Sequence, residues 1–375
     1  MIKFWSYKRE YFRYKTHLLK KINNTISSGA TFFGKELSKF EKDFIKKNKA
    51  KYGIAVGSGT DALLISLKSI GVKTGDEVIT VANTAIPTIS AIINAGATPR
   101  LVDINNNYLI DVNKIEKEIN SKTRAIIPVH LYGQPCDMDK IIKISKKYNI
   151  PVIEDCAQAQ GAIYKKKKIG NFGKFGCFSF YPTKILGAYG DGGFITTNDY
   201  NEYKKIKRIR FYGIETENKK NRFNKKYYAN ENGVNSRLDE IQAAILNFKL
   251  KNVPNFINRR RKIAQFYLKE LADTDLALPV EGDNLKHVYH LFTVSHPKSE
   301  IITSQLKKKK IETRKIYPFP IHKMKAYSKI IKNKKRLKNS EIKSKRIFCL
   351  PLYPELRDKE VKIICKTLKQ ILKKI

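Results

Sequence analysis

The stretch FGCFSFYPTKILGAYGDGG, residues Phe175–Gly193, decides the fold. Its apolar run Cys177–Tyr181 has the length and aromatic content of a buried strand, and a Pro-Thr-Lys step and a glycine cluster follow at once. Lys184 is therefore expected just past the end of a strand. A lysine in such an apolar setting has a lowered pKa, and a neutral amine can attack an aldehyde. The stretch predicts a lysine that forms a Schiff base.

A second short strand is predicted upstream, over residues 149–155, with the sequence NIPVIED. An acid at the carboxyl end of a parallel strand faces the ligand crevice of an α/β sheet. Pyridoxal phosphate needs such a pair: a lysine for its aldehyde and a carboxylate that keeps its pyridine nitrogen protonated. In a chain with 75 Lys and Arg, most lysines are solvated surface charges, but the pairing of Lys184 with Asp155 favours a cofactor site.

The turn Gly57-Ser58-Gly59-Thr60 leads into an apolar helix predicted over residues 61–69. Free backbone N–H groups at a helix start bind anions, so the turn could hold a phosphate group. A plain helix cap explains the same residues equally well. Both interpretations stay open on this evidence.

Short apolar strands alternate with helices along the first half of the chain, which indicates βαβ crossovers and a mostly parallel sheet. The strands are expected at residues 52–56, 77–81, 100–103, 125–130 and 194–197, and the helices at 10–23, 34–49, 61–69, 83–95, 112–119, 138–148 and 202–210. Further helices are expected at 238–251 and 257–271, a strand at 289–294, and a surface loop at 214–232. We predict an α/β large domain over residues 1–250 and a smaller α+β domain over 251–375.

The formal net charge of +41 raises the question of nucleic-acid binding. The charge is spread over the chain rather than focused: lysine tetrads stand at 165–168 and 307–310, and a looser basic stretch runs over 323–346. Lys, Asn and Ile are abundant everywhere, which indicates a compositional bias. We therefore predict no nucleic-acid partner.

The composition favours a cytoplasmic protein. No run of 18 apolar residues exists, and charges interrupt the N-terminal stretch MIKFWSYKREYFRYK where a signal peptide needs an apolar core, so we predict no membrane association. The five cysteines show neither CxxC nor metal-ligand spacing. We expect free thiols and no metal site.

Seven segments, taken in order, resemble the DegT/DnrJ/EryC1/StrS family of sugar aminotransferases. They are VGSGTDAL, GDEVIT, IIPVHLYGQ, VIEDCAQAQGA, FSFYPTKILGAYGDGG, GVNSRLDEIQAAIL and IYPFPIH, between about Gly53 and Pro354. Each segment alone is a weak signal, but together they are highly specific. The resemblance implies an aspartate-aminotransferase-like large domain (fold type I) and a pyridoxal phosphate (PLP) cofactor.

The resemblance also implies the residues that hold the cofactor. Phosphate contacts fall on Gly59, Thr60 and Ser179, and on Asn235 reaching over from a neighbouring subunit. Lys184 would bind the aldehyde and serve as catalytic base and acid, while Asp155 and Gln158 would hold the ring. The expected assembly is a homodimer with shared active sites. Many relatives stack an aromatic side chain on the ring where this chain has Ala85, so that contact stays unassigned.

The substrates implied by the resemblance are L-glutamate and a nucleotide-linked ketosugar, with Tyr317 and His322 near the sugar. His130 ends a predicted strand and is therefore expected near the crevice, as a substrate contact or equally as a structural residue. The turn ANTAIPTISAI is similar to enzymes that aminate C3 of a dTDP-3-keto-6-deoxyhexose. Amination at C4 of a dTDP- or UDP-4-keto-6-deoxyhexose is the alternative. Two further alternatives are a sugar dehydratase, against which the retained Lys184 argues, and a non-catalytic regulator, for which no DNA-binding module is evident.

Overall fold

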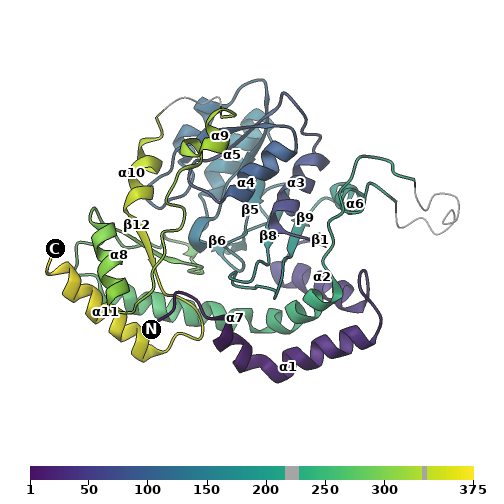
Figure 1. The fold of residues 1–375 in the computed structure, drawn as a ribbon. Coiled ribbons are helices and arrows are strands. Elements are labelled where there is room, and N and C mark those ends of the chain that lie inside the picture. Colours follow the sequence, from purple (N-terminus) through teal and green to yellow (C-terminus); the bar gives the residue numbers. More distant parts are fainter. Residues whose placement is uncertain (216–227, 332–335) are drawn as a thin grey trace.

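The computed structural model describes residues 1–375 except 216–227 and 332–335, and it shows a central sheet between helices (Figure 1). One part of the sheet has the order β1-β9-β8-β5 and the other the order β3-β2-β4, and isolated bridges from β5 to β4 join the two. Only β9 runs antiparallel to its neighbours among these strands. The prediction of an α/β fold with a mostly parallel sheet is confirmed. The strands are β1 Tyr52–Val56, β2 Glu77–Val81, β3 Thr98–Val102, β4 Thr123–Ile127, β5 Ile153–Asp155, β8 Phe175–Ser179 and β9 Gly193–Thr197.

Helices cover both faces of the sheet because successive strand residues point to opposite sides. Along β1, Ile54 and Val56 pack in one hydrophobic cluster with α3 and α6, whereas Ala55 packs in another with α2 and α7. The cluster on the α3 side also holds part of α4, and α5 packs against the other face. The bounds are α2 Lys35–Asn48, α3 Gly59–Ser69, α4 Ile86–Asn94, α5 Met138–Tyr148, α6 Tyr200–Ile209 and α7 Glu240–Glu270.

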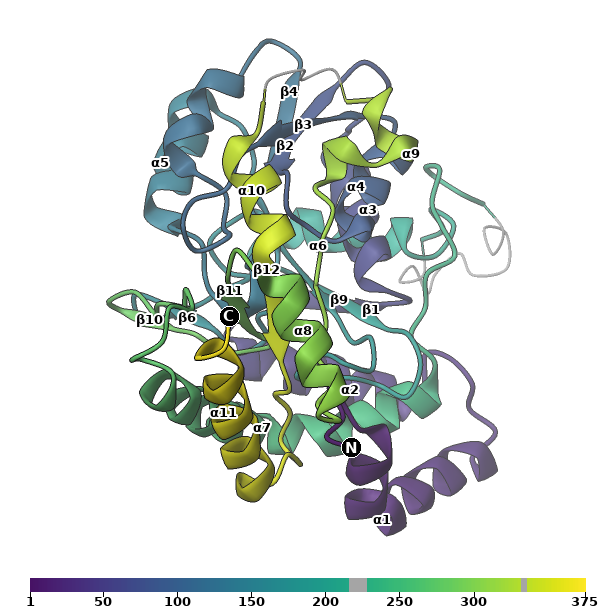
Figure 2. The ribbon, with the colours of Figure 1, turned by 60° about the vertical axis from the view of Figure 1, so that its left-hand side comes forward.

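The C-terminal part of the chain has its own hydrophobic core, built on the second half of α7 (Figure 2). Ile2 also joins this core, and its backbone N–H donates to the Lys310 carbonyl at 2.8 Å. The division into domains 1–250 and 251–375 stays a prediction. The remaining elements are α1 Tyr7–Ser27, β6 Ile163–Tyr164, β7 Lys167–Lys168, β10 Leu285–Lys286, β11 Phe292–Ser295, α8 Ser299–Lys308, α9 Lys325–Ser328, α10 Lys338–Arg346, β12 Ile347–Leu350 and α11 Asp358–Leu372.

Two helices were expected at 238–251 and 257–271, but the structure has one continuous helix, α7, with Pro254 inside it. A proline cannot donate to the carbonyl four residues before it, which here is that of Leu250. The Lys47 ammonium donates to this carbonyl instead, at 2.7 Å, so the helix continues. Although α7 has 31 residues, neither it nor another helix in the described ranges is apolar enough over sufficient length to cross a membrane.

The helix expected at residues 112–119 is wrong. This segment forms two short 3-10 turns, Val112–Lys114 and Glu116–Glu118. The Asp111 side chain caps the first turn by accepting from the Asn113 N–H, but the backbone is extended again at Ile119, so no regular helix follows. The loop expected at 214–232 falls mostly on residues 216–227, outside the described residues.

The start of α2 depends on Glu240, which is buried and accepts from the backbone N–H groups of Gly34, Glu36 and Leu37 at 2.9, 2.9 and 3.1 Å. Glu240→Ala should destabilise the protein by about 3 kcal/mol, because it leaves these donors without an acceptor. The expected readout is a thermal unfolding midpoint lower by several degrees. Glu300→Ala, which removes an exposed ion pair, is the matched control. Equal midpoints for the two variants would contradict this role of Glu240.

Candidate active site

Lys184 lies in the turn that follows β8, as the sequence predicts. Its backbone N–H donates to the Tyr181 carbonyl at 2.8 Å, and the Ala188 N–H returns to the Phe180 carbonyl at 2.8 Å. Gly187 allows this tight turn, because a Cβ there would lie 2.3 Å from the Pro182 carbonyl oxygen. The partly buried Lys184 ammonium has no hydrogen-bond acceptor within the described part of the chain. The amine is therefore held in place but left free to react.

The surroundings of Lys184 favour its neutral form. Desolvation by the surrounding protein lowers the pKa of Lys184 to about 8, and the charge of Asp155 opposes this only in part. Burial also raises the pKa of Asp155, against the effect of its hydrogen bonds and of the nearby Lys184 charge. The acid and the amine thus lie close enough to act on each other electrostatically, as the strand pattern predicts.

The Asp155 carboxylate is fixed from two sides. One oxygen accepts from the Ala157 N–H at 3.1 Å, and the other accepts from the Thr88 hydroxyl at 2.9 Å. Thr88 is fully buried in α4 and exchanges a hydrogen bond with Thr84 at 2.9 Å. Thr88 could not be singled out from the sequence, since no spacing pattern distinguishes it from other residues at a helix start.

The start of α3 has the features both of a plain helix cap and of a phosphate-binding turn. Ser58 caps the helix by accepting from the Asp61 N–H at 3.0 Å. The N–H groups of Gly59 and Thr60 have no acceptor among the described residues. Ser179 lies beside them, because a Cβ on Gly59 would be 2.7 Å from the Ser179 Cβ. Free N–H groups, a hydroxyl and a helix N-terminus together form a fitting phosphate cradle.

Gln160, which the sequence analysis also missed, holds the loop that carries Lys184. Its side-chain amide donates to the carbonyls of Ser179 at 2.6 Å and Leu186 at 3.3 Å, and its oxygen accepts from the Leu186 N–H at 3.0 Å. A buried side chain thus joins the end of β8 to the segment after the lysine. Nothing in the segment Gln158-Ala159-Gln160 indicates which of the two glutamines holds the lysine loop.

Gln158 and Tyr317 come together as a pair. The Gln158 amide donates to the Tyr317 hydroxyl at 2.8 Å, and its oxygen accepts from the Tyr132 N–H at 2.8 Å. Tyr317 has a φ of 36°, a conformation that non-glycine residues adopt at a cost, which is typical of functional segments. Nearby, the buried Asn83 makes no hydrogen bond of ordinary geometry among the described residues, and its side chain lies close enough to the Tyr132 hydroxyl to oppose the rise of that group's pKa on burial. An amide with unused hydrogen-bonding capacity is compatible with a ligand at this place.

His130 is placed differently from the other predicted sugar contacts. Its ring is fully buried, with Nε2 3.2 Å from a Glu154 oxygen and Nδ1 accepting from the Cys136 N–H at 3.0 Å. Glu154 also accepts from the backbone N–H groups of Gly170, Phe172 and Gly173. This geometry favours the structural role of His130, and its contact with a sugar stays a prediction. The buried group of His130, Glu154 and Cys156 has the make-up of a metal site, but these bonds already satisfy the Glu154 carboxylate.

His322 and Asn235 are the two remaining predicted site residues. His322 Nε2 is 3.0 Å from a Glu341 oxygen, and its buried Nδ1 has no partner among the described residues. Asn235 is exposed and bridges to Phe211 through its backbone. An exposed position is compatible with a contact to a neighbouring subunit.

Comparison with known proteins places this chain in a family. The model of the DegT/DnrJ/EryC1/StrS aminotransferase family matches residues 13–369. The chain is 42% identical over 362 residues to the dTDP-3-amino-3,6-dideoxy-alpha-D-galactopyranose transaminase of Aneurinibacillus thermoaerophilus, covering 96% of this chain and 97% of the relative. The chain belongs to the DegT/DnrJ/EryC1/StrS aminotransferase family.

Two more similarities agree with membership of this aminotransferase family. The dTDP-3-amino-3,4,6-trideoxy-alpha-D-glucose transaminase of Micromonospora megalomicea subsp. nigra is 38% identical over 359 residues, covering 94% of each chain. The crystal structure of S. venezuelae DesV in complex with a ketimine intermediate has a TM-score of 0.94 and 33% identity, covering 100% of this chain and 99% of the other. The predicted family, fold type, transaminase activity and PLP cofactor are thereby confirmed.

The residues present fit PLP. The reactive Lys184 and the fixed Asp155 supply partners for the aldehyde and the ring nitrogen, and the N–H groups of Gly59 and Thr60 supply partners for the phosphate. The roles of the individual site residues stay predictions.

The pKa of Lys184 makes its reactivity depend on pH. Below a pH of about 8 the amine is mostly protonated and cannot attack an aldehyde, whereas above it the neutral form dominates. The rate at which PLP labels Lys184 in cofactor-free protein, trapped with borohydride and read by peptide mapping, should rise with a midpoint near pH 8.

Asp155→Asn removes the charge that favours the Lys184 ammonium, so this midpoint should move below 8 in the variant. Labelling of the exposed Lys166 should not respond to the substitution and serves as an internal control. An unchanged Lys184 midpoint in Asp155→Asn would show that the two groups do not interact.

Proposed function

We propose that this aminotransferase transfers the amino group of L-glutamate to a nucleotide-linked 3-ketosugar, namely a dTDP-3-keto-6-deoxyhexose, in deoxyaminosugar and surface polysaccharide synthesis. The observation that carries the proposal is the pairing of the reactive Lys184 with Asp155 at the ends of two neighbouring parallel strands. Asn83, beside Tyr132, and Tyr317, which is bonded to Gln158, supply polar groups for a sugar.

Amination at C3 is favoured over C4 by the relatives. The two named transaminases, at 42% and 38% identity over nearly the whole chain, both carry dTDP-3-amino sugars in their names. The 3-amino-3,6-dideoxy product of the first corresponds to amination of a 3-keto-6-deoxyhexose. A small change in a pocket can redirect such specificity, so an enzyme assay, and not sequence identity with relatives, determines the substrate.

The proposed residue roles are supported by the contacts described above. Bound PLP supplies an electron sink that stabilises negative charge on the substrate carbon. Lys184 would move a proton between the substrate carbon and the C4′ carbon of the cofactor, first with the amino donor and then, in the reverse direction, with the acceptor sugar. Asp155, held by Thr88 and the Ala157 N–H, keeps the ring nitrogen protonated. Gly59, Thr60 and Ser179 bind the phosphate, and Gln158 orients the ring.

We further propose a homodimer in which Asn235 completes the phosphate site of the neighbouring subunit. Exposure of Asn235 in the single chain supports this, because its own subunit leaves the side chain uncovered. The proposed location is the cytoplasm. The five cysteines are buried free thiols, which suits a reducing compartment.

Lys184→Ala should reduce amino transfer at least about a thousandfold, because the proton carrier and the cofactor attachment are both lost. The assay measures dTDP-3-amino-6-deoxyhexose formed from L-glutamate and the 3-keto sugar by mass spectrometry, with the 4-keto isomer run in parallel. Lys166→Ala, an exposed site, is the matched control. Faster amination of the 4-keto isomer would contradict the C3 assignment, and substantial turnover by Lys184→Ala would contradict the catalytic role.

Shared sites can be tested by complementation. Lys184→Ala and Asn235→Ala should each be nearly inactive, but a heterodimer of the two contains one site with both residues intact. Co-expressed chains carrying different affinity tags should therefore give a heterodimer with roughly half of the wild-type activity. Pairing Lys184→Ala with the double variant Lys184→Ala/Asn235→Ala restores no complete site and is the control. Equal activity of the two heterodimers would exclude a shared site.

A further inference from the structure

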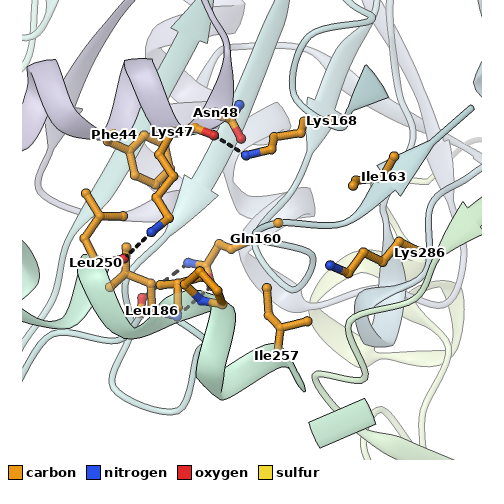
Figure 3. Close-up of a pocket in the computed structure, with 13 residues that line it drawn as sticks. Phe44, Lys47, Asn48, Gln160, Ile163, Lys168, Leu186, Leu250, Ile257 and Lys286 are labelled. Atoms are coloured by element: carbon orange, nitrogen blue, oxygen red, sulfur yellow. Dashed lines mark hydrogen bonds between the residues drawn. The ribbon is translucent and has the colours of Figure 1, made fainter. Parts of the chain in front are cut away.

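An apolar pocket with a basic rim lies between the end of α2, the middle of α7 and the β6–β7 hairpin (Figure 3). Its volume is about 130 Å³. The wall is mostly apolar, and no residue of the lining is acidic. The apolar side chains of the lining include Phe44, Ile163, Leu186, Leu250, Val253 and Ile257.

Three lysines border the pocket: Lys47, Lys168 and Lys286. Burial lowers the pKa of Lys47 and of Lys168, and the neighbouring lysine charges lower that of Lys168 further. Like charges in a partly desolvated place repel each other, and a negative charge among them would relieve this repulsion. The electrostatics of the rim therefore favour an anion.

Structural roles account for only part of this lysine cluster. Lys47 donates to the Leu250 carbonyl that Pro254 leaves free, and Lys168 donates to the Lys47 carbonyl in the last turn of α2. Each ammonium has three N–H donors, so both retain donors for another acceptor. The Lys286 ammonium has no hydrogen-bond or ion-pair partner in the described part of the chain, and Figure 3 shows its side chain extending across the pocket.

We propose that this pocket binds a small amphipathic carboxylate, with its apolar part against Ile257 and its carboxylate between Lys168 and Lys286. The size supports this class of ligand, since an apolar cavity of about 150 Å³ is known to hold benzene. The apolar wall disfavours inorganic anions, and the lysines disfavour neutral or cationic ligands. This site is separate from the proposed cofactor residues and does not depend on the proposed substrate.

Gln160 connects the pocket with the active site. It belongs to the pocket lining, and its amide makes the three bonds that hold Ser179 and Leu186 on either side of Lys184. A ligand in the pocket would contact the side chain that fixes the lysine loop.

The test is titration of the PLP-loaded protein with benzoate and with hexanoate, followed by saturation-transfer NMR. The neutral isostere benzamide should bind at least about tenfold more weakly than benzoate, because it lacks the charge that the lysines recognise. Lys286→Met and Lys168→Met keep the apolar stem and should each weaken benzoate binding by about tenfold. Lys166→Met, on the same hairpin but exposed and outside the pocket, should have no effect.

Lys286→Met is the decisive variant because the Lys286 ammonium has no hydrogen-bond or ion-pair partner to lose among the described residues, and an unchanged thermal midpoint will show that the variant folds. Weakened binding in Lys286→Met with unchanged binding in Lys166→Met supports the site. Equal binding of benzoate to wild type and Lys286→Met would place the ligand elsewhere, the amino-donor site included, and overturns the proposal. Failure of both benzoate and hexanoate to bind wild type overturns it as well.

Discussion

The buried Glu154 carboxylate is the interaction on which the active site depends. It accepts three backbone N–H groups, from Gly170, Phe172 and Gly173 at 2.7 to 2.8 Å, and it lies 3.2 Å from His130. Each of these donors would cost about 1–3 kcal/mol if buried without a partner. The carboxylate therefore fixes the chain before β8 against the end of β5. Because side chains alternate along a strand, the next residue, Asp155, points to the other side. One acid thus holds the core while its neighbour serves the site.

The lysine loop depends on a second buried polar group. Gln160 binds the backbone before and after Lys184, so the position of the lysine is set by the core beneath it rather than by contacts of its own side chain. This arrangement leaves the Lys184 ammonium without an acceptor among the described residues, and burial lowers its pKa. A rigid backbone with an unpaired side chain is what a nucleophile requires.

Much of this arrangement could be predicted from the sequence, because strand endings are local features. The apolar run before Lys184 and the run that ends in Asp155 each show where a strand stops, and parallel strands bring such endings to one edge. The role of His130 could not be predicted in the same way. A strand that ends in two consecutive acids, Glu154 and Asp155, does not reveal which acid faces the core, and the partner of His130 depends on that choice. Thr88 and Gln160 were missed because their partners are backbone or side-chain groups distant in sequence.

The continuity of α7 also could not be predicted from the local sequence. It depends on a lysine, and the buried lysines of this chain differ in the partners that they find. The presence of Pro254 in the sequence predicts a break in the helix. The Lys47 ammonium, however, donates to the Leu250 carbonyl, which lacks its usual helical donor, and the helix continues. Desolvation lowers the pKa of Lys47, Lys168 and Lys184 alike. What separates them is the acceptor: Lys47 and Lys168 donate to backbone carbonyls, whereas Lys184 has no acceptor in the described part of the chain and interacts electrostatically with Asp155. A partly desolvated lysine therefore stabilises a helix where it donates to a backbone carbonyl, and it is a reactive amine where it has no such acceptor.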